Sequence, residues 1–162
     1  MKNMWIMCWI ILALVMLLTH THGQGCPPGF IKSPGSATCY KMFLEEVSPA
    51  AAKKKCASEG LVLAQPSDAE VVALRDVIVD TYDGVWVAAA WVAATGDENG
   101  QYFWSRDDTT VPQKLFSPWF LVYSGAKCLA LLLDADSGRA PQQPYGPSYC
   151  AETNSVLCQG KP

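Results

Sequence analysis

Residues 85–104 read VWVAAAWVAATGDENGQYFW, and this stretch decides the fold. Its first half, Val85 to Ala94, is apolar and rich in Trp and Val, which favours a β-strand. The polar run Thr95 to Gly100 is typical of a turn, so Gln101 to Trp104 is expected to be the returning strand. We therefore predict a hairpin whose Trp91 and Trp104 side chains are buried in the core.

On the C-terminal side of this hairpin the sequence alternates between short strands and loops. Arg106 to Gly125 is irregular in pattern. Cys128 to Leu133 is continuously apolar, which predicts a strand buried on both faces. Ser137 to Pro147 is rich in Pro, Gly and Gln and is expected to be an exposed loop. Two short strands, Tyr149-Cys150 and Ser155 to Gln159, complete the prediction for this half.

On the N-terminal side the pattern is first strand-like and then helical. Short strands are predicted at Phe30 to Lys32, Thr38 to Met42 and Leu61 to Ala64. Ser48-Pro49 suits the cap and first position of a helix over Ala50 to Glu59, which Gly60 ends. Cys56 lies on this helix one turn after Ala52 and is expected to face inward.

A second helix is predicted from Ser67 to about Asp80. Ser67-Asp68-Ala69-Glu70 matches a capping box, in which Glu70 reaches back to the cap. Val71, Leu74 and Ile78 recur at the spacing of one buried helical stripe. Two early helices followed by a strand-rich half indicate a single domain of the α+β class.

The first 23 residues have the pattern of a secretory signal peptide. A positively charged start with Lys2 is followed by an unbroken apolar run from Trp5 to Leu18 and then by small residues. The run of about 14 residues is short for a bilayer span, which takes about 20, although a signal anchor stays an alternative. We expect cleavage after Gly23, or alternatively after Gly25. The prediction is a signal peptide at 1–23 and one secreted, extracellular domain at 24–162, with no membrane span.

Six cysteines remain after this segment, at 26, 39, 56, 128, 150 and 158. An even number in a secreted chain predicts three disulfides, but spacing alone allows 15 pairings. Zinc binding is the alternative, and it is disfavoured because the sequence has no CxxC pair.

Charge and histidine content limit the function classes. The chain has 12 Lys and Arg against 15 Asp and Glu, and this balance argues against nucleic-acid binding. Lys53-Lys54-Lys55 could form a basic patch, but three successive lysines fan around a helix, which favours a solvated face. Its only histidines, His20 and His22, precede the expected cleavage point. A Ser-His-Asp or Cys-His arrangement cannot form without histidine, and paired cysteines offer no thiol nucleophile. A carboxylate pair of the glycosidase type stays open, but we expect a binding protein rather than an enzyme.

Several segments in this order resemble the C-type-lectin-like domain. They are the opening Cys26-Pro27-Pro28-Gly29-Phe30, Cys56 on the first helix, Trp91-Val92-Ala93-Ala94, Gly100-Gln101-Tyr102-Phe103-Trp104 and Val156-Leu157-Cys158-Gln159. The resemblance covers Cys26 to Cys158. It implies the C-type-lectin-like fold, with disulfides Cys26–Cys39, Cys56–Cys158 and Cys128–Cys150. It also implies a glycan-binding lectin, with a role in innate immunity.

Sugar-binding members of this family hold Ca²⁺ with residues from two segments, and this sequence differs from them in both segments. Those members use a Glu-Pro-Asn or Gln-Pro-Asp triplet and a later Asn-Asp pair, because Ca²⁺ requires six to eight oxygen ligands. Between Trp119 and Cys128 this chain has FLVYSGAK, and before Cys150 it has Tyr145-Gly146-Pro147. Because the side-chain oxygens are missing, no cofactor is expected. The weak alternative is a secondary calcium site in which Asp107 and Asp108 lie beside Asp97.

Recognition is instead assigned to aromatic and amide side chains of the loop region. The predicted ligand-binding residues are Trp119, Tyr123, Gln142, Gln143, Tyr145 and Tyr149. Aromatic rings with polar edges suit sugar rings or a protein partner. The sequence therefore predicts recognition of glycans or, alternatively, calcium-independent binding of a protein or another surface.

Overall fold

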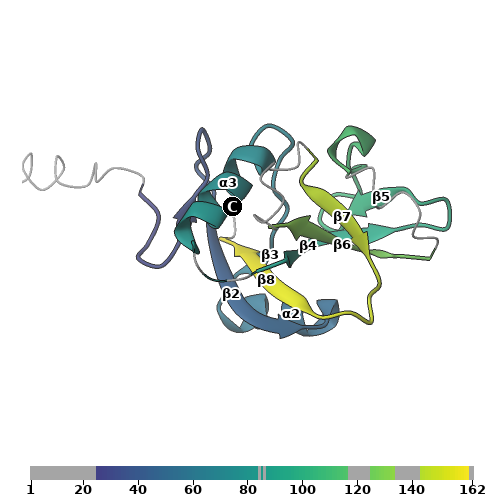
Figure 1. The fold of residues 1–162 in the computed structure, drawn as a ribbon, viewed down its shortest axis with the longest axis horizontal. Helices are drawn as coiled ribbons and strands as arrows, with labels where there is room; N and C mark the ends of the chain where they lie inside the picture. The colour runs from purple at the N-terminus through teal and green to yellow at the C-terminus, as the bar shows by residue number, and fades with distance from the viewer. Residues whose placement is uncertain (1–24, 84, 86, 117–124, 134–142, 161–162) are drawn as a thin grey trace, which may run out of the picture.

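The computed structural model describes residues 25–83, 85, 87–116, 125–133 and 143–160. These residues form an α+β domain, as predicted, with helices α2 (Pro49–Ser58) and α3 (Val71–Thr81) and a short 3₁₀-helix at Gln113–Leu115 (Figure 1). The strands are β1 (Ile31–Lys32), β2 (Cys39–Val47), β3 (Val62–Leu63), β4 (Ala89–Gly96), β5 (Tyr102–Trp104), β6 (Cys128–Leu132), β7 (Tyr145–Ser148) and β8 (Asn154–Gln159).

The strands form one mixed sheet in which the last strand is central. The order is β1-β2-β8-β4-β6-β7, with β3 paired to β8 and β5 paired to β4. Strand β8 is antiparallel to β2 and β3 but parallel to β4, where Trp91 lies opposite Val156. The backbone N–H of Gly160 donates to the carbonyl of Cys39 at 3.0 Å. The end of β8 is therefore held against the N-terminal hairpin.

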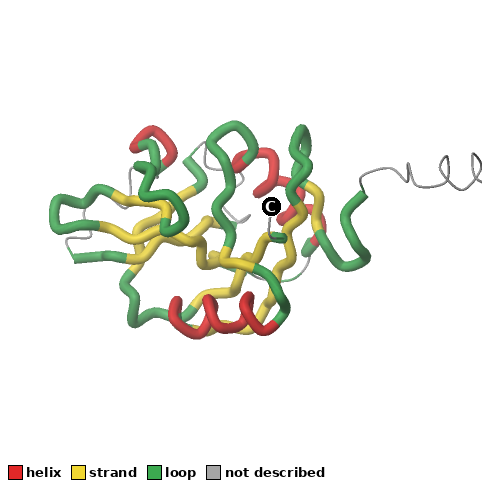
Figure 2. Tube along the Cα trace, turned by 180° about the vertical axis from the view of Figure 1, so that it is seen from behind, coloured by secondary structure: helices red, strands yellow, loops and turns green. Residues whose placement is uncertain are grey.

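The two helices lie on opposite sides of the β2–β8 pair (Figures 1 and 2). Helix α2 begins as predicted, with Ser48 Oγ accepting from the N–H of Ala51 at 3.5 Å and Pro49 in the first turn. Its buried residues Ala52 and Cys56 pack with Trp91, which confirms the inward orientation of Cys56. Helix α3 buries Val71, Leu74 and Ile78 in a second cluster on the other face, and this confirms the predicted stripe.

The predicted capping box of α3 is wrong. The helix begins at Val71, and its first turn has no side-chain cap. The Glu70 carboxylate accepts hydrogen bonds from the Tyr40 hydroxyl and, at 2.8 Å, from Ser67 Oγ, instead of reaching a backbone N–H. Because a tertiary partner takes the carboxylate, residues 68–70 form a turn ahead of the helix.

Strand prediction was correct in the centre of the sheet and wrong at its edge. The β4–β5 hairpin forms with Ala94 opposite Trp104, and Trp91 and Trp104 are buried as expected. Strand β6 is buried along nearly its whole length. Strand β7, in contrast, occupies the predicted loop, whereas Tyr149 and Cys150 lie beyond its end and form no strand. Its residues pair with β6 from Cys128 opposite Ser148 to Leu131 opposite Tyr145.

The structure contains the three disulfides that the resemblance implied: Cys26–Cys39, Cys56–Cys158 and Cys128–Cys150. The second joins α2 to β8 across 102 residues, and both of its cysteines are fully buried. In the described residues, no helix is long and apolar enough to cross a membrane. The predicted signal peptide at 1–23 lies outside the described residues.

We expect removal of the Cys56–Cys158 bridge to destabilise the domain more than removal of Cys26–Cys39. In the chain-entropy model a loop of about 100 residues contributes about 4–5 kcal/mol, against about 3 kcal/mol for a loop of about 15. The corresponding sequence separations are 102 and 13 residues. Denaturant unfolding of the double variants C56A/C158A and C26A/C39A measures the difference. An equal or reversed loss of unfolding free energy would contradict the central role of β8.

Candidate functional site

The loop face is the end of the sheet at which β4, β5 and β6 meet, and its described part comprises residues 97–101, 125–127, 149 and 150. The N–H of Gly96 donates to the carbonyl of Lys127 at 2.9 Å, and the Tyr102 hydroxyl donates to the carbonyl of Ala126 at 2.7 Å. The Cys128–Cys150 disulfide ties the end of β7 to the start of β6. These contacts give the loop face a fixed backbone.

The predicted ligand residues do not all belong to one surface. Trp119, Tyr123 and Gln142 lie outside the described residues. Gln143 and Tyr149 flank the two ends of β7, six positions apart, which corresponds to about 20 Å of extended chain. Tyr149 is 39% exposed and Gln143 is half-buried. Only Tyr149 therefore lies on the described part of the loop face.

Tyr145 is a core residue, which corrects its assignment to an exposed ligand-binding loop. Its side chain has no exposed area, and its ring lies 5.7 Å from that of Trp104 in an edge-on contact. Burial raises the pKa of its hydroxyl well above the ordinary value. The residue is buried because β7 pairs with β6, and the pleat directs its side chain into the core beside Phe116.

The segment Tyr145-Gly146-Pro147 presents no side-chain oxygen to the surface. Tyr145 points into the core, and neither Gly146 nor Pro147 carries a polar side chain. A Cβ atom placed on Gly146 would lie 2.8 Å from a methyl group of Leu132, so the sheet packs tightly over this glycine. The position at which the resemblance implies an Asn-Asp calcium ligand pair is thus filled by a closely packed strand.

The carboxylates of Asp97 and Asp107, which were considered for a secondary ion site, accept hydrogen bonds from nearby protein groups. Asp97 Oδ1 accepts from the backbone N–H groups of Asn99 at 2.9 Å and Gln101 at 2.8 Å. Asp107 accepts from Thr109 Oγ1 at 2.6 Å and from Gln65 Nε2 at 2.9 Å.

Asp97 and the Asp107-Asp108 pair do not lie side by side, contrary to the prediction. Asp97 precedes β5 and Asp107-Asp108 follow it, so the two groups lie at opposite ends of this strand. Asp108 is held in a left-handed turn, with φ 54°. Within the described ranges, no three His, Cys, Asp or Glu side chains gather in a way that could hold a metal ion.

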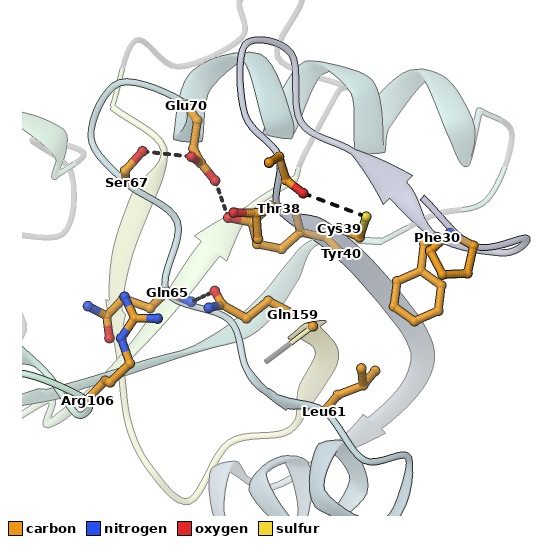
Figure 3. A pocket seen from close by; sticks show the side chains of 13 residues that line it. Phe30, Thr38, Cys39, Tyr40, Leu61, Gln65, Ser67, Glu70, Arg106 and Gln159 are labelled. Carbon is orange, nitrogen blue, oxygen red and sulfur yellow. Dashed lines mark hydrogen bonds between the residues drawn. The ribbon is translucent and has the colours of Figure 1, made fainter. Parts of the chain in front are cut away.

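A second concave region, the terminal pocket, lies between the N-terminal hairpin, the start of α3 and the end of β8 (Figure 3). Its volume is about 620 Å³. The residues that line it are Pro27, Phe30, Ala37, Thr38, Cys39, Tyr40, Leu61, Gln65, Ser67, Glu70, Arg106, Gln159 and Gly160. No ligand residue was predicted here from the sequence, because these positions are spread over more than 130 residues.

Hydrogen bonds hold the polar wall of the terminal pocket in place. The Gln159 amide oxygen accepts from the backbone N–H of Gln65 at 2.7 Å, and Glu70 binds the Tyr40 hydroxyl. Burial, followed by the hydrogen bond that its hydroxyl donates to Glu70, raises the pKa of Tyr40 above its ordinary value. Tyr40 is therefore a neutral hydrogen-bond donor at physiological pH.

A central strand β8, two flanking helices and three disulfides together define a crosslinked α+β scaffold that presents loops at one end. No protein-family model matches the chain, and no curated protein matches it. Solved structures do match over most of its length. Human lithostathine gives a TM-score of 0.65 at 18% identity, over 85% of this chain and all of that one.

Two further structures lead to the same fold. A calcium-independent type II antifreeze protein gives a TM-score of 0.61 at 17% identity, over 86% of this chain and 97% of that one. The carbohydrate-recognition domain of the mouse scavenger receptor C-type lectin gives a TM-score of 0.60 at 20% identity, over 85% of this chain and 98% of that one. The chain has the C-type-lectin-like fold, as the sequence resemblance implied.

Folding is expected to lower the pKa of Asp97 below the ordinary value of 3.8, because backbone N–H groups, first that of Gln101, bind its ionised form. The ionised carboxylate then favours the folded hairpin above pH 3.8, and this contribution is lost as the pH falls through the folded-state pKa. An NMR titration of the Asp97 carboxyl carbon measures the midpoint. D97A should lower the melting temperature at neutral pH, whereas D97N keeps an acceptor and should lower it less. A midpoint at or above 3.8 would contradict the turn geometry.

Proposed function

We propose that this protein is a secreted binding protein that recognises glycans without calcium through its loop face, in innate immunity. The observation that carries the calcium-independent part is the packing of Tyr145-Gly146-Pro147 as strand β7, without a side-chain oxygen for an ion. The other calcium-ligand position, in residues 119–127, carries no carboxylate or amide in its sequence. A site without these oxygens lacks the ligands that Ca²⁺ requires.

Aromatic and amide chemistry takes the place of the ion in this proposal. Tyr149 presents an exposed ring beside the Cys128–Cys150 disulfide, which fixes its backbone. A tyrosine ring offers an apolar face to a sugar ring and a hydroxyl to its edge. Trp119, Tyr123 and Gln142 remain proposed contributors, whereas Gln143, at the far end of β7, and the buried Tyr145 do not.

The matched structures support both parts of the proposal as analogies. The mouse scavenger receptor domain is described as a carbohydrate-recognition domain, and the type II antifreeze protein as calcium-independent. The same fold therefore includes carbohydrate recognition and calcium-independent proteins. The antifreeze protein also favours the alternative function, calcium-independent binding of a protein or another surface. Either function makes the chain a binding protein, which agrees with the absence of histidine from residues 24–162.

Glycan binding is expected to survive chelation. A glycan array probed with the labelled protein should give the same bound glycans in Ca²⁺ and in EDTA, because no ion bridges the sugar to the protein. Y149A should weaken the bound signals about tenfold, the equivalent of 1.4 kcal/mol. L44A removes an exposed apolar side chain from β2 and serves as the matched control. Loss of binding in EDTA would overturn the calcium-independent site, and an array without any signal would favour the protein- or surface-binding alternative.

Secretion is proposed to remove residues 1–23. N-terminal sequencing of the protein secreted from a eukaryotic host should begin at Gln24, because the apolar run is followed by small residues up to Gly23. A start at Cys26 would place the cut after Gly25. A product retained in the membrane with Met1 intact would show a signal anchor and contradict the proposed secretion.

A further inference from the structure

The terminal pocket has the size and lining of a small-molecule site. Its volume of about 620 Å³ lies within the range of about 300–1,000 Å³ that is usual for ligand pockets. Phe30 and Leu61 supply apolar surface, whereas Thr38, Gln65 and Glu70 supply hydrogen-bonding groups (Figure 3). The pocket is formed by the terminal segments of the domain and does not include any residue of the loop face.

Arg106 is the positively charged residue of the pocket lining. Within the described part of the chain, its guanidinium makes no hydrogen bond or salt bridge, whereas Arg75 pairs with Asp76 at 2.6 Å. The charge of Arg106 partly opposes the rise in the pKa of Tyr40 that burial causes. Hydrogen bonds from Thr109 lower the pKa of Asp107, and the charge of Arg106 adds to that effect. A guanidinium whose planar donors have no protein partner is suited to bind a carboxylate through two parallel hydrogen bonds.

Gln65 forms part of the pocket wall, and its amide is held in one orientation. Its Nε2 donates to Asp107 Oδ2 at 2.9 Å, which fixes the orientation of the amide. The other amide atom, Oε1, is buried and has no hydrogen-bond partner. Because this atom is not accessible from the pocket, Gln65 contributes a fixed wall beside Arg106 and is not assigned a ligand hydroxyl.

Glu70 lies across the pocket from Arg106 in Figure 3 and does not compete for an anion at the arginine. One of its carboxylate oxygens accepts from Tyr40 and the other from Ser67. Asp107 is likewise bound to Gln65 and Thr109 and lies outside the lining. The pocket thus has a cationic end at Arg106, next to the Gln65 amide, and an acceptor-rich end at Thr38 and Glu70.

We propose that the terminal pocket binds a small hydroxylated carboxylate of the size of a sugar acid. Arg106 pairs with the carboxylate, Thr38 and Glu70 bind the hydroxyls, and Phe30 packs against the carbon skeleton. The site is separate from the loop face and does not depend on the proposed glycan function. Its ligand is either a free acid or the acidic end of a glycan.

The experiment is a titration of ¹⁵N-labelled protein with three ligands of similar ring size, followed by amide chemical shifts. Methyl β-glucuronide has the carboxylate and the hydroxyls, methyl β-glucoside lacks the carboxylate, and cyclohexanecarboxylate lacks the hydroxyls. Methyl β-glucuronide should bind at least about tenfold more tightly than either of the others, with the largest shifts at residues 38, 65 and 106. Free glucuronate, measured in parallel, separates a soluble acid from a glycan end, because the methyl glycoside mimics the latter.

Variants test the assigned contacts. R106Q should reduce the affinity for methyl β-glucuronide to that for methyl β-glucoside, and R106K should retain part of the difference because it keeps the charge but not the paired donors. K54Q removes one positive charge from the exposed face of α2 and should leave all affinities unchanged. Equal affinities for the three ligands, an unaffected R106Q protein, or no shift at pocket residues with either form of glucuronate would overturn the proposal. None of these results bears on calcium-independent binding at the loop face, so the two proposals fail separately.

Discussion

The position of strand β8 in the middle of the sheet is the constraint on which the rest of the structure depends. This strand, at the C-terminal end of the domain, pairs with β2, β3 and β4 and contributes to both core clusters. Such non-local pairing costs chain entropy, and the buried Cys56–Cys158 bridge reduces that cost in the unfolded state. The two core clusters then form on either face, with Trp91 packed toward α2 and Leu74 packed in the cluster of α3.

This architecture separates what stabilises the domain from what recognises a ligand. The scaffold is held by strand pairing, two apolar clusters and covalent crosslinks, and the connection after β5 adds Val111, Leu115 and Phe116 to the core. Strand β7 shows how such a connection can be converted into sheet. Gly146 permits close packing on Leu132, and Tyr145 fills the core beside Trp104. Because these residues pack into the sheet and the core, this segment has no exposed side-chain oxygens that could bind Ca²⁺.

The sequence predicted the elements whose signals are local. Helix α2 was predicted correctly because Ser48 and Pro49 are capping residues that act within one turn. The capping box at Ser67 failed because the Glu70 carboxylate binds the hydroxyl of Tyr40, thirty positions away. Strand β7 was missed because Gly and Pro favour loops. Pairing with β6 at the edge of the sheet tolerates Pro147, since an edge strand can lack one N–H donor. The terminal pocket has no sequence signal, because the fold brings together residues from both ends of the domain.

The contact between Gly160 and Cys39 has a consequence for how this domain could be tethered. Pro27 and Gly160 both border the terminal pocket, so the chain enters and leaves the domain at the same rim. A linker or fused partner attached at either terminus would crowd that rim and leave the distant loops open to solvent. Immobilisation of the protein through a terminus would therefore leave the loops facing away from the support. A bulky tag at a terminus would hinder access of a ligand to the pocket.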